Sequence, residues 1–291
     1  MNISVIIPCC NAEKFLKRLL KRLLAQSVRA EIIVVDSGST DRTAEIASAF
    51  SDRVRLIQIK RSEFDHGATR DMALRISSGE LVIFMSQDAL PVKSTSLERL
   101  AAALNDQKIA AAFGRQIAYR NAPAYERYVR EFNYPPVSRI WSKSDIHKYG
   151  IKSYFFSDSF SVYRRVAFEK VGGFDRPVGT NEDMLMAAKL LHAGYSLAYV
   201  SEAEVFHSHR STLKEDYYRN KKSGYVMEKY RDRLTGSNAD KEGVRMVSFV
   251  SKKLLRHGRP DQLIVFYFHA AARFLGNRSG KYACKKGKPA P

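Results

Sequence analysis

The chain has 291 residues, 45% of them hydrophobic, and a formal net charge of +19 at pH 7. Its length fits one large α/β domain with an appendage, and its apolar content supports a sizeable core. Three cysteines without a CxxC spacing argue against a disulfide framework or a zinc site and fit a reducing cytosol, whereas the charge indicates an anionic partner.

The first part of the chain alternates between predicted strands and helices. Continuous apolar runs predict buried strands at 3–8, 31–36, 54–59 and 80–85. Helical spacing between them predicts helices over 11–28, from Ser39 through AEIASAF, and over 68–76. This alternation predicts a mostly parallel sheet with crossover helices. The N-terminal MNISVIIPCC is interpreted as a strand and not as a signal peptide.

The second part is less regular. A helix is predicted over 94–104 and a strand over 109–119, followed by an irregular aromatic stretch over 121–153. A helix is expected to start within 156–165, and a strong helix is predicted over 181–194. Two short strands at 195–200 and 203–209 follow, and then basic helices from about 211. No segment reaches the roughly 18 apolar residues that a membrane-spanning helix needs.

Two aspartates follow predicted strands. Asp36 ends the second strand and Asp88 follows the fourth, so a parallel sheet would bring both carboxylates to its ligand-binding edge. Helix capping is the alternative, and we accept it for Asp41. For Asp36 and Asp88 the all-apolar strands favour a nucleotide with a divalent cation. Mg²⁺ or Mn²⁺ prefers one or two protein carboxylates plus diphosphate oxygens.

Several short motifs together resemble one enzyme family. SVIIPCCNAE followed by VVDSGSTDRT resembles the nucleotide-binding start of inverting, family 2 glycosyltransferases of GT-A fold. HGATR, SQDA, GGFD, NEDMLMAAKLLHAGY and VFHSH resemble its bacterial rhamnosyltransferase branch. The resemblance covers about residues 2–230. It implies a GT-A catalytic domain over 1–230, with a nucleotide-sugar-binding half (1–115) and an acceptor-binding half (116–230). Residues 231–291, beyond the resemblance, are predicted to form a basic amphipathic helical extension.

The resemblance also implies roles for residues in the donor half. Pro8 and Cys10 would pack against the nucleobase, and Asp36 would accept a hydrogen bond from a base N–H. Arg70 would neutralise the diphosphate or contact the base. These residues are therefore expected to bind the nucleotide sugar.

The metal-binding motif departs from the family pattern. Asp88 matches the last Asp of the DxD motif and would hold Mg²⁺ or Mn²⁺. Ser86 stands in place of the first Asp, so Gln87 is expected to take over its ribose contact. His207, at the end of the last predicted strand, aligns with a family histidine that closes over the diphosphate or completes the metal shell.

Adjacent acids begin the predicted 181–194 helix. The helix dipole alone would explain Glu182 and Asp183, but the resemblance identifies Asp183 as the general base of the family's ED motif. An inverting transfer needs such a group, because an acceptor hydroxyl must lose a proton on the face opposite the leaving diphosphate. Glu182, Asp158 and His209 are predicted to bind the acceptor.

The C-terminal part combines cations with apolar residues. Helical spacing of this kind is typical of a helix that lies in the plane of a membrane, and packing on the catalytic domain is the alternative. Both stay open for 245–256, and membrane contact is favoured for 261–286. No nucleic-acid-binding motif appears. An anionic membrane surface is therefore the expected partner, with a cytoplasmic, peripheral location on the inner face of the cell membrane.

The sequence predicts a metal-dependent inverting glycosyltransferase. By resemblance it would move rhamnose from dTDP-rhamnose onto a lipid-linked polysaccharide or glycolipid acceptor. A UDP-hexose or UDP-N-acetylhexosamine donor is the near alternative. A nucleotidyltransferase would need a Gly-rich loop after the first strand, which IIPCCNAEKF lacks. A non-catalytic membrane- or nucleic-acid-binding module would leave Asp36, Asp88 and Asp183 without a role.

Overall fold

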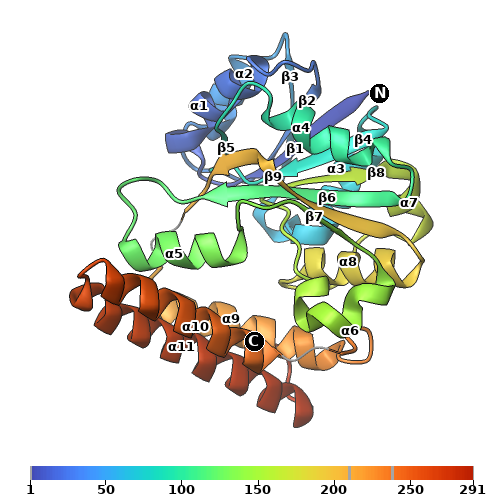
Figure 1. Ribbon diagram of the computed structural model, residues 1–291. Helices are drawn as coiled ribbons and strands as arrows, with labels where there is room; N and C mark the ends of the chain where they lie inside the picture. The colour runs from blue at the N-terminus through green and yellow to red at the C-terminus, as the bar shows by residue number, and fades with distance from the viewer. Residues whose placement is uncertain (1, 209–210, 237–238, 291) are drawn as a thin grey trace.

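A single mixed sheet forms the centre of the protein, and a layer of C-terminal helices lies beneath it (Figure 1). The computed structural model describes residues 2–208, 211–236 and 239–290. In this described part the strands lie across the sheet in the order β3 (Val54–Ile59), β2 (Glu31–Ser37), β1 (Ile3–Cys9), β4 (Leu81–Met85), β8 (Phe160–Arg164), β6 (Ile109–Ile117), β9 (Ser196–Phe206) and β5 (Leu90–Pro91), and β7 (Arg139–Trp141) pairs with β9.

The sheet is mostly parallel, as predicted. Strands β3, β2, β1 and β4 pair in parallel, and so do β6 and β9. Strand β8 lies antiparallel between β4 and β6, so it reverses the direction twice and leaves both parallel groups pointing the same way. The carboxyl ends of these six strands therefore meet at one edge, where α/β sheets bind ligands.

Helices cover both faces of the sheet. They are α1 (Glu13–Leu24), α2 (Thr43–Ser48), α3 (His66–Ile76), α4 (Ser96–Ala102), α5 (Ala124–Asn133), α6 (Ile146–Tyr149), α7 (Arg165–Lys170) and α8 (Glu182–His192). Short 3₁₀ turns occupy Arg61–Glu63, Ala103–Asn105, Lys143–Asp145 and Gly150–Ser153. Alternation along β1 fills both layers: Ile6 faces the core under α3 and α8, whereas Val5 and Ile7 face the core under α1 and α4.

Three expectations for the second part were wrong. Residues 156–165 do not start a helix before Arg165, where α7 begins, because Phe160–Arg164 forms β8 and hydrogen-bonds to a strand on each side. The two short strands predicted over 195–209 are one strand, β9, whose register with β6 shifts between Gly114 and Arg115. The irregular stretch contains α5, which packs through Ala124 and Tyr125.

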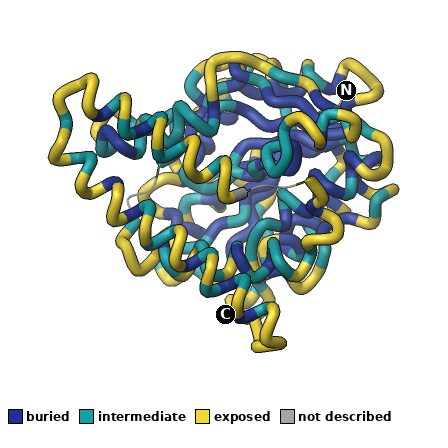
Figure 2. The backbone as a smooth tube through the Cα atoms, turned by 60° about the horizontal axis from the view of Figure 1, so that its bottom comes forward, coloured by how far each residue is buried: buried dark blue, intermediate teal, exposed yellow. Residues whose placement is uncertain are grey.

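Three further helices follow, α9 (Leu213–Lys229), α10 (Ala239–Arg256) and α11 (Pro260–Lys285). Val250 and Leu254 of α10 are buried against Tyr125 of α5 and Phe266 of α11. For α10 the structure thus agrees with packing on the catalytic domain. In Figure 2 the strands are buried, whereas the outward sides of these helices are exposed. No helix in the described part of the chain is long and apolar enough to cross a bilayer.

Glycines allow α9 and α11 to touch backbone to backbone. A Cβ at Gly280 would lie 1.9 Å from the carbonyl oxygen of Lys221, and one at Gly276 would lie 2.2 Å from that of Tyr217. On α9, a Cβ at Gly224 would lie 2.2 Å from the carbonyl oxygen of Asn277. A backbone carbonyl inside a helix cannot move aside without displacing the helix.

Replacing Gly280 with alanine should therefore destabilise the C-terminal helices. Overpacking of this kind costs about 1–3 kcal/mol, which urea unfolding followed by circular dichroism would detect. The matched control is Gly243→Ala on α10, where a Cβ meets nothing within 4 Å. That control should gain about 0.5–1 kcal/mol from helix propensity. Equal stability of Gly280→Ala and the unmodified protein would contradict the packing described here.

Candidate active site

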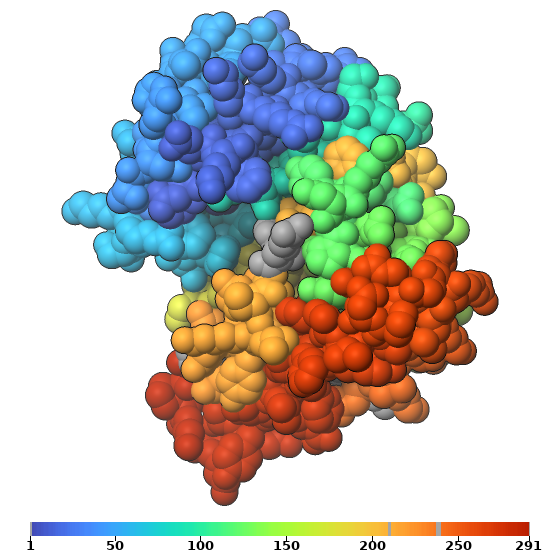
Figure 3. Space-filling view, turned by 90° about the vertical axis from the view of Figure 1, so that its left-hand side faces the viewer, coloured from blue at the N-terminus to red at the C-terminus, as the bar shows by residue number. Residues whose placement is uncertain are grey.

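The predicted site residues lie at the carboxyl edge of the parallel strands. Figure 3 faces this edge, and the surface is hollowed there between the N-terminal half and α9. Asp36 at the end of β2 is 2% exposed, and its Oδ1 accepts hydrogen bonds from the Ser39 backbone N–H at 3.2 Å and from the Ser39 hydroxyl. Asp41 accepts the N–H of Thr43 at 3.0 Å, which agrees with its capping role at the start of α2.

The loops after β1 and β4 are joined by one side chain. Gln87 Oε1 accepts the backbone N–H of Cys10 at 2.8 Å, and Gln87 Nε2 donates to the carbonyl of Cys10 at 3.1 Å. Pro8 pairs in register with Val35 of β2. Pro8, Cys10 and Gln87 are thus held beside one another at the end of the sheet. A cavity of about 280 Å³ opens next to Gln87 and Asp88, with Arg18 and Tyr119 in its wall.

Asp88 and His207 lie together although they are far apart in sequence. His207 Nε2 lies 3.4 Å from Asp88 Oδ1, and His207 Nδ1 lies 2.8 Å from Gln116 Oε1. Arg130 also donates to this Gln116 oxygen, which identifies it as an acceptor and assigns the histidine proton to Nδ1. Burial lowers the pKa of His207, so the ring is in the neutral form that metals bind.

This pair suits a divalent cation. A carboxylate together with diphosphate oxygens is the usual ligand set of Mg²⁺ or Mn²⁺, and neutral imidazole is a common additional ligand. Over the described ranges there is no group of three His, Cys, Asp or Glu side chains that could hold a metal ion by itself. A cation at Asp88 and His207 would therefore take its remaining ligands from the substrate and water.

An ion pair joins the start of α8 to α3. Arg70 Nη1 lies 3.0 Å from Glu182 Oε1 and donates to the carbonyl of His66 at 2.9 Å. Both partners of the ion pair are buried. Asn181, the residue before Glu182, has a φ of +62°, a left-handed conformation that asparagine tolerates. The structure therefore brings Arg70, predicted to serve the donor, against Glu182, predicted to serve the acceptor.

Asp183 faces a cavity of about 290 Å³, which His66, Phe156 and Asn181 also line. Its Oδ1 accepts the Met184 N–H at 2.8 Å and its Oδ2 accepts the Asp158 N–H at 3.4 Å. Burial raises the pKa of Asp183 well above its usual range, and the nearby charges of Glu182 and Asp158 raise it further. A carboxylate with a raised pKa is a stronger base than an exposed one, as general-base catalysis requires.

Asp158 lies behind Asp183 and is 2% exposed. Its Oδ1 accepts hydrogen bonds from the hydroxyls of Ser161 at 2.7 Å and Tyr163 at 2.8 Å. Burial raises the pKa of Asp158 to about 6. His209 lies outside the described residues.

A row of polar contacts connects the two ends of the site. Gln116, which contacts His207, donates through Nε2 to the Ser157 hydroxyl at 2.8 Å. The next residue, Asp158, donates its backbone N–H to Asp183. Sequence reasoning missed Gln116. Its signal was a buried amide in a mostly apolar strand, since such a group needs partners.

Two residues near Arg70, Asp71 and Ala68, form local contacts that stabilise the fold. Asp71, the residue after Arg70, is turned to the 171–176 turn, where its Oδ1 accepts the Phe174 N–H at 3.3 Å and its Oδ2 pairs with Arg176. The N–H of Ala68 donates to Asp65 at 2.8 Å and so caps the start of α3. Neither Asp71 nor the Ala68 N–H is therefore directed at the cavities described above.

Known proteins resemble this chain over most of its length. The model of glycosyl transferase family 2 matches residues 4–172. The chain is 36% identical over 289 residues to the O-antigen chain rhamnosyltransferase RfbN of Salmonella typhimurium, which covers 97% of this chain and 90% of that protein. It is 38% identical over 259 residues to the O-antigen chain rhamnosyltransferase WbaN of Salmonella anatum, with coverages of 87% and 80%.

Solved structures share the fold at low sequence identity. The mannosyltransferase PcManGT from Pyrobaculum calidifontis, in complex with GDP-Man and Mn²⁺, aligns with a TM-score of 0.67 and 16% identity over 99% of this chain and 88% of that one. Residues 1–349 of S. aureus TarS, in complex with UDP-GlcNAc, align with a TM-score of 0.59 and 17% identity over 100% and 93%. The chain therefore belongs to glycosyl transferase family 2 and is a glycosyltransferase of GT-A fold.

Proposed function

We propose that this glycosyltransferase transfers rhamnose from dTDP-rhamnose, with inversion, to a lipid-linked saccharide in the synthesis of a cell-envelope polysaccharide. The observation that carries the proposal is the setting of Asp183, a half-buried carboxylate of raised pKa at the wall of a cavity, connected by polar contacts to Asp88 and His207. The names of the two Salmonella relatives support the sugar.

In this mechanism each end of the site serves one substrate. Asp36, Pro8 and Cys10 hold the nucleotide, and Asp88 with His207 would hold a divalent cation, which would supply positive charge to neutralise the leaving diphosphate. Asp183 removes the proton from the acceptor hydroxyl as that oxygen attacks the anomeric carbon. The bond from the anomeric carbon to the diphosphate oxygen breaks on the opposite face, so the configuration inverts.

The ion pair of Arg70 with Glu182 positions the base. Because Glu182 precedes Asp183 at the first turn of α8, fixing Glu182 to α3 holds the base against the cavity. The acceptor hydroxyl would approach from the cavity that Asn181 and His66 line. Glu182 and Asp158 thereby contribute to the acceptor site through the position and basicity of Asp183.

A donor screen tests the sugar assignment. Purified enzyme with Mg²⁺ or Mn²⁺ is incubated with dTDP-rhamnose, UDP-glucose, UDP-N-acetylglucosamine or GDP-mannose, and the nucleotide diphosphate released by slow hydrolysis is measured. We expect dTDP-rhamnose to be used in preference. Turnover of a UDP-sugar with none of dTDP-rhamnose would overturn the donor assignment, and the family assignment would stand.

We also propose that α11 holds the enzyme on an anionic membrane surface. One face of this helix is exposed and apolar over five turns: Ile264, Tyr267, Phe268, Phe274, Leu275 and Tyr282 are all between 47% and 62% exposed. Residues 239–291 contain twelve Lys and Arg against three Asp and Glu. Apolar side chains with surrounding cations are the features of a helix that lies in the headgroup region of a bilayer.

Sedimentation with vesicles tests this surface. Wild-type protein should sediment with phosphatidylcholine vesicles that contain phosphatidylglycerol, less so with phosphatidylcholine alone, and less at high salt because salt screens the charges. Phe268→Ser with Phe274→Ser should reduce the partition coefficient at least about tenfold, since each buried aromatic contributes about 1.5–3 kcal/mol. The control is Val166→Ser, at an exposed apolar residue of α7. Equal binding of the double variant and the control would contradict the proposal.

A further inference from the structure

A third cavity adjoins the one that Asp183 faces. Its volume is about 180 Å³. Phe155 and Met184 line both cavities, and Met184 follows Asp183 in sequence. A ligand that presents a hydroxyl to Asp183 could therefore continue past these two side chains without leaving the protein surface.

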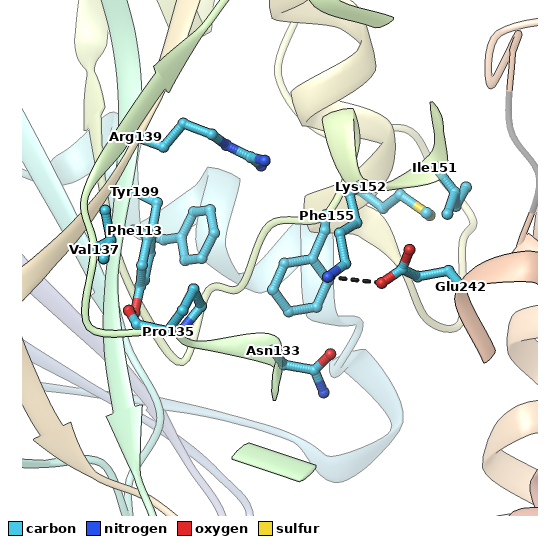
Figure 4. A pocket seen from close by; sticks show the side chains of 11 residues that line it. Phe113, Asn133, Pro135, Val137, Arg139, Ile151, Lys152, Phe155, Tyr199 and Glu242 are labelled. Carbon is cyan, nitrogen blue, oxygen red and sulfur yellow. Dashed lines mark hydrogen bonds and ion pairs between the residues drawn. The ribbon is translucent and has the colours of Figure 1, made fainter. Parts of the chain in front are cut away.

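The walls of this cavity combine aromatic rings with polar groups (Figure 4). Phe113, Phe155 and Tyr199 supply the rings, and Arg139 and Asn133 extend beside them. The Tyr199 hydroxyl already donates to the carbonyl of Pro135 at 2.7 Å. Tyr199 would therefore contact a ligand through its ring. Hydrogen bonds to the ligand would come from Arg139 and Asn133.

Arg139 is the most informative of these groups. Its guanidinium carbon lies 4.7 Å from the ring centre of Trp141 and 4.2 Å from that of Tyr149. Burial lowers its pKa, and no carboxylate of the described residues forms an ion pair with it. These two rings hold the guanidinium at the cavity that Arg139 lines, where its N–H groups can donate to a neutral or anionic acceptor.

One wall comes from the C-terminal helices. Glu242 of α10 forms an ion pair of 2.7 Å with Lys152 at the mouth of the cavity. Lys152 also lies 4.1 Å from the ring centre of Phe132. The cavity is thus completed by a residue of a helix outside the α/β sheet core, so its shape depends on the presence of this helix in this place.

Aromatic faces beside planar, hydrogen-bonding side chains are suited to sugar rings, which present C–H groups on one face and hydroxyls around the rim. We propose that this cavity binds the sugar that precedes the accepting sugar in the acceptor saccharide. The assignment rests on the proposed function, because it takes Asp183 as the base that receives the acceptor hydroxyl.

Blocking the cavity at its rim tests the assignment. Val137 lines the cavity and is 69% exposed, whereas Ile140 is 61% exposed and does not line it. Val137→Trp should therefore fill the cavity mouth without affecting the fold, and Ile140→Trp is the matched control. Thermal melting by circular dichroism would verify that both variants fold alike.

The readout compares acceptors of two lengths. A panel of synthetic octyl monosaccharides is assayed against octyl disaccharides with the same non-reducing sugar, using whichever donor the screen identifies. For the unmodified protein and Ile140→Trp, kcat/KM should be at least about tenfold higher for the disaccharide, which corresponds to about 1.4 kcal/mol. For Val137→Trp the ratio should fall to about one, through KM and not kcat.

Two polar variants extend the test. Arg139→Met and Glu242→Gln should each lower the disaccharide preference. Arg245 forms the other ion pair of Glu242 but does not line the cavity. Arg245→Gln should therefore keep the preference. An unchanged ratio in both Val137→Trp and Arg139→Met would overturn the assignment. Failure of the proposed function is distinguishable, because it would appear as a loss of donor preference in the hydrolysis screen.

Discussion

Asp183→Asn should abolish most turnover and leave donor binding intact. A positioned general base contributes about 10²–10⁴-fold to a rate, so kcat should fall by that factor. The amide has nearly the shape of the carboxylate, and its oxygen can still accept the Met184 N–H, whereas its NH₂ group cannot accept the longer bond of 3.4 Å from the Asp158 N–H. Titration calorimetry with the nucleotide diphosphate should give an unchanged Kd, and kinetics with acceptor should show the loss.

The dependence of kcat/KM on pH gives this prediction a second test. The base works only when deprotonated, and burial with two nearby acids raises the pKa of Asp183. The acid limb should therefore lie well above pH 3.9, the ordinary value for aspartate. Glu182→Gln removes one of the charges that raise this pKa, so the limb should move to lower pH. An acid limb unaffected by Glu182→Gln would contradict the assignment of Asp183 as the titrating base.

Asp88→Asn should remove divalent-cation binding at the donor site. Loss of a charged ligand weakens the attraction for Mn²⁺, and the leaving diphosphate loses the neutralisation that metal catalysis supplies. We expect kcat/KM to fall at least about a hundredfold. Electron paramagnetic resonance of Mn²⁺ with the nucleotide diphosphate should show less bound metal, independently of any turnover.

Asp41→Asn is the control for this substitution. Asp41 lies at the same edge of the sheet, but its carboxylate binds the N–H groups of Thr43 and Glu13 through its two oxygens, and the amide oxygen of asparagine can still accept one of these bonds. It should bind Mn²⁺ and turn over like the unmodified protein. If Asp88→Asn bound the metal as well as Asp41→Asn does, the cation would have to be held elsewhere.

The regular first half of the fold could be predicted because its signals are local. An apolar run bounded by turn residues identifies β1 or β4 without knowledge of neighbouring strands, and helical spacing identifies α1. Strand β8 was missed because its five residues, FSVYR, become a strand through pairing with β4 and β6, which no local pattern records. Helix α5 did carry a signal, since Tyr125, Val129 and Phe132 recur at helical spacing.

The candidate site was predictable as a set of residues and not as a set of contacts. Asp36, Asp88 and Asp183 stand out by their positions at strand and helix ends, and family resemblance names their roles. The ion pair of Arg70 with Glu182 joins residues 112 positions apart, and its existence depends on where α3 and α8 are packed. Gln116 likewise gains its importance only from the side chains brought to it by β9 and α5.

The glycine contacts between α9 and α11 constrain how this protein can change in length. Each residue inserted into a helix turns everything beyond it by about 100°. An insertion in the loop between α9 and α10 would leave the Gly276 and Gly280 contacts in place. One inserted between these two glycines would put a residue with a Cβ in the place of Gly280, against a backbone carbonyl of α9, and would rotate Tyr282 away from the face formed by Ile264 and Phe268. Lineages of this enzyme should therefore vary in the length of that loop and hold the length of α11 fixed.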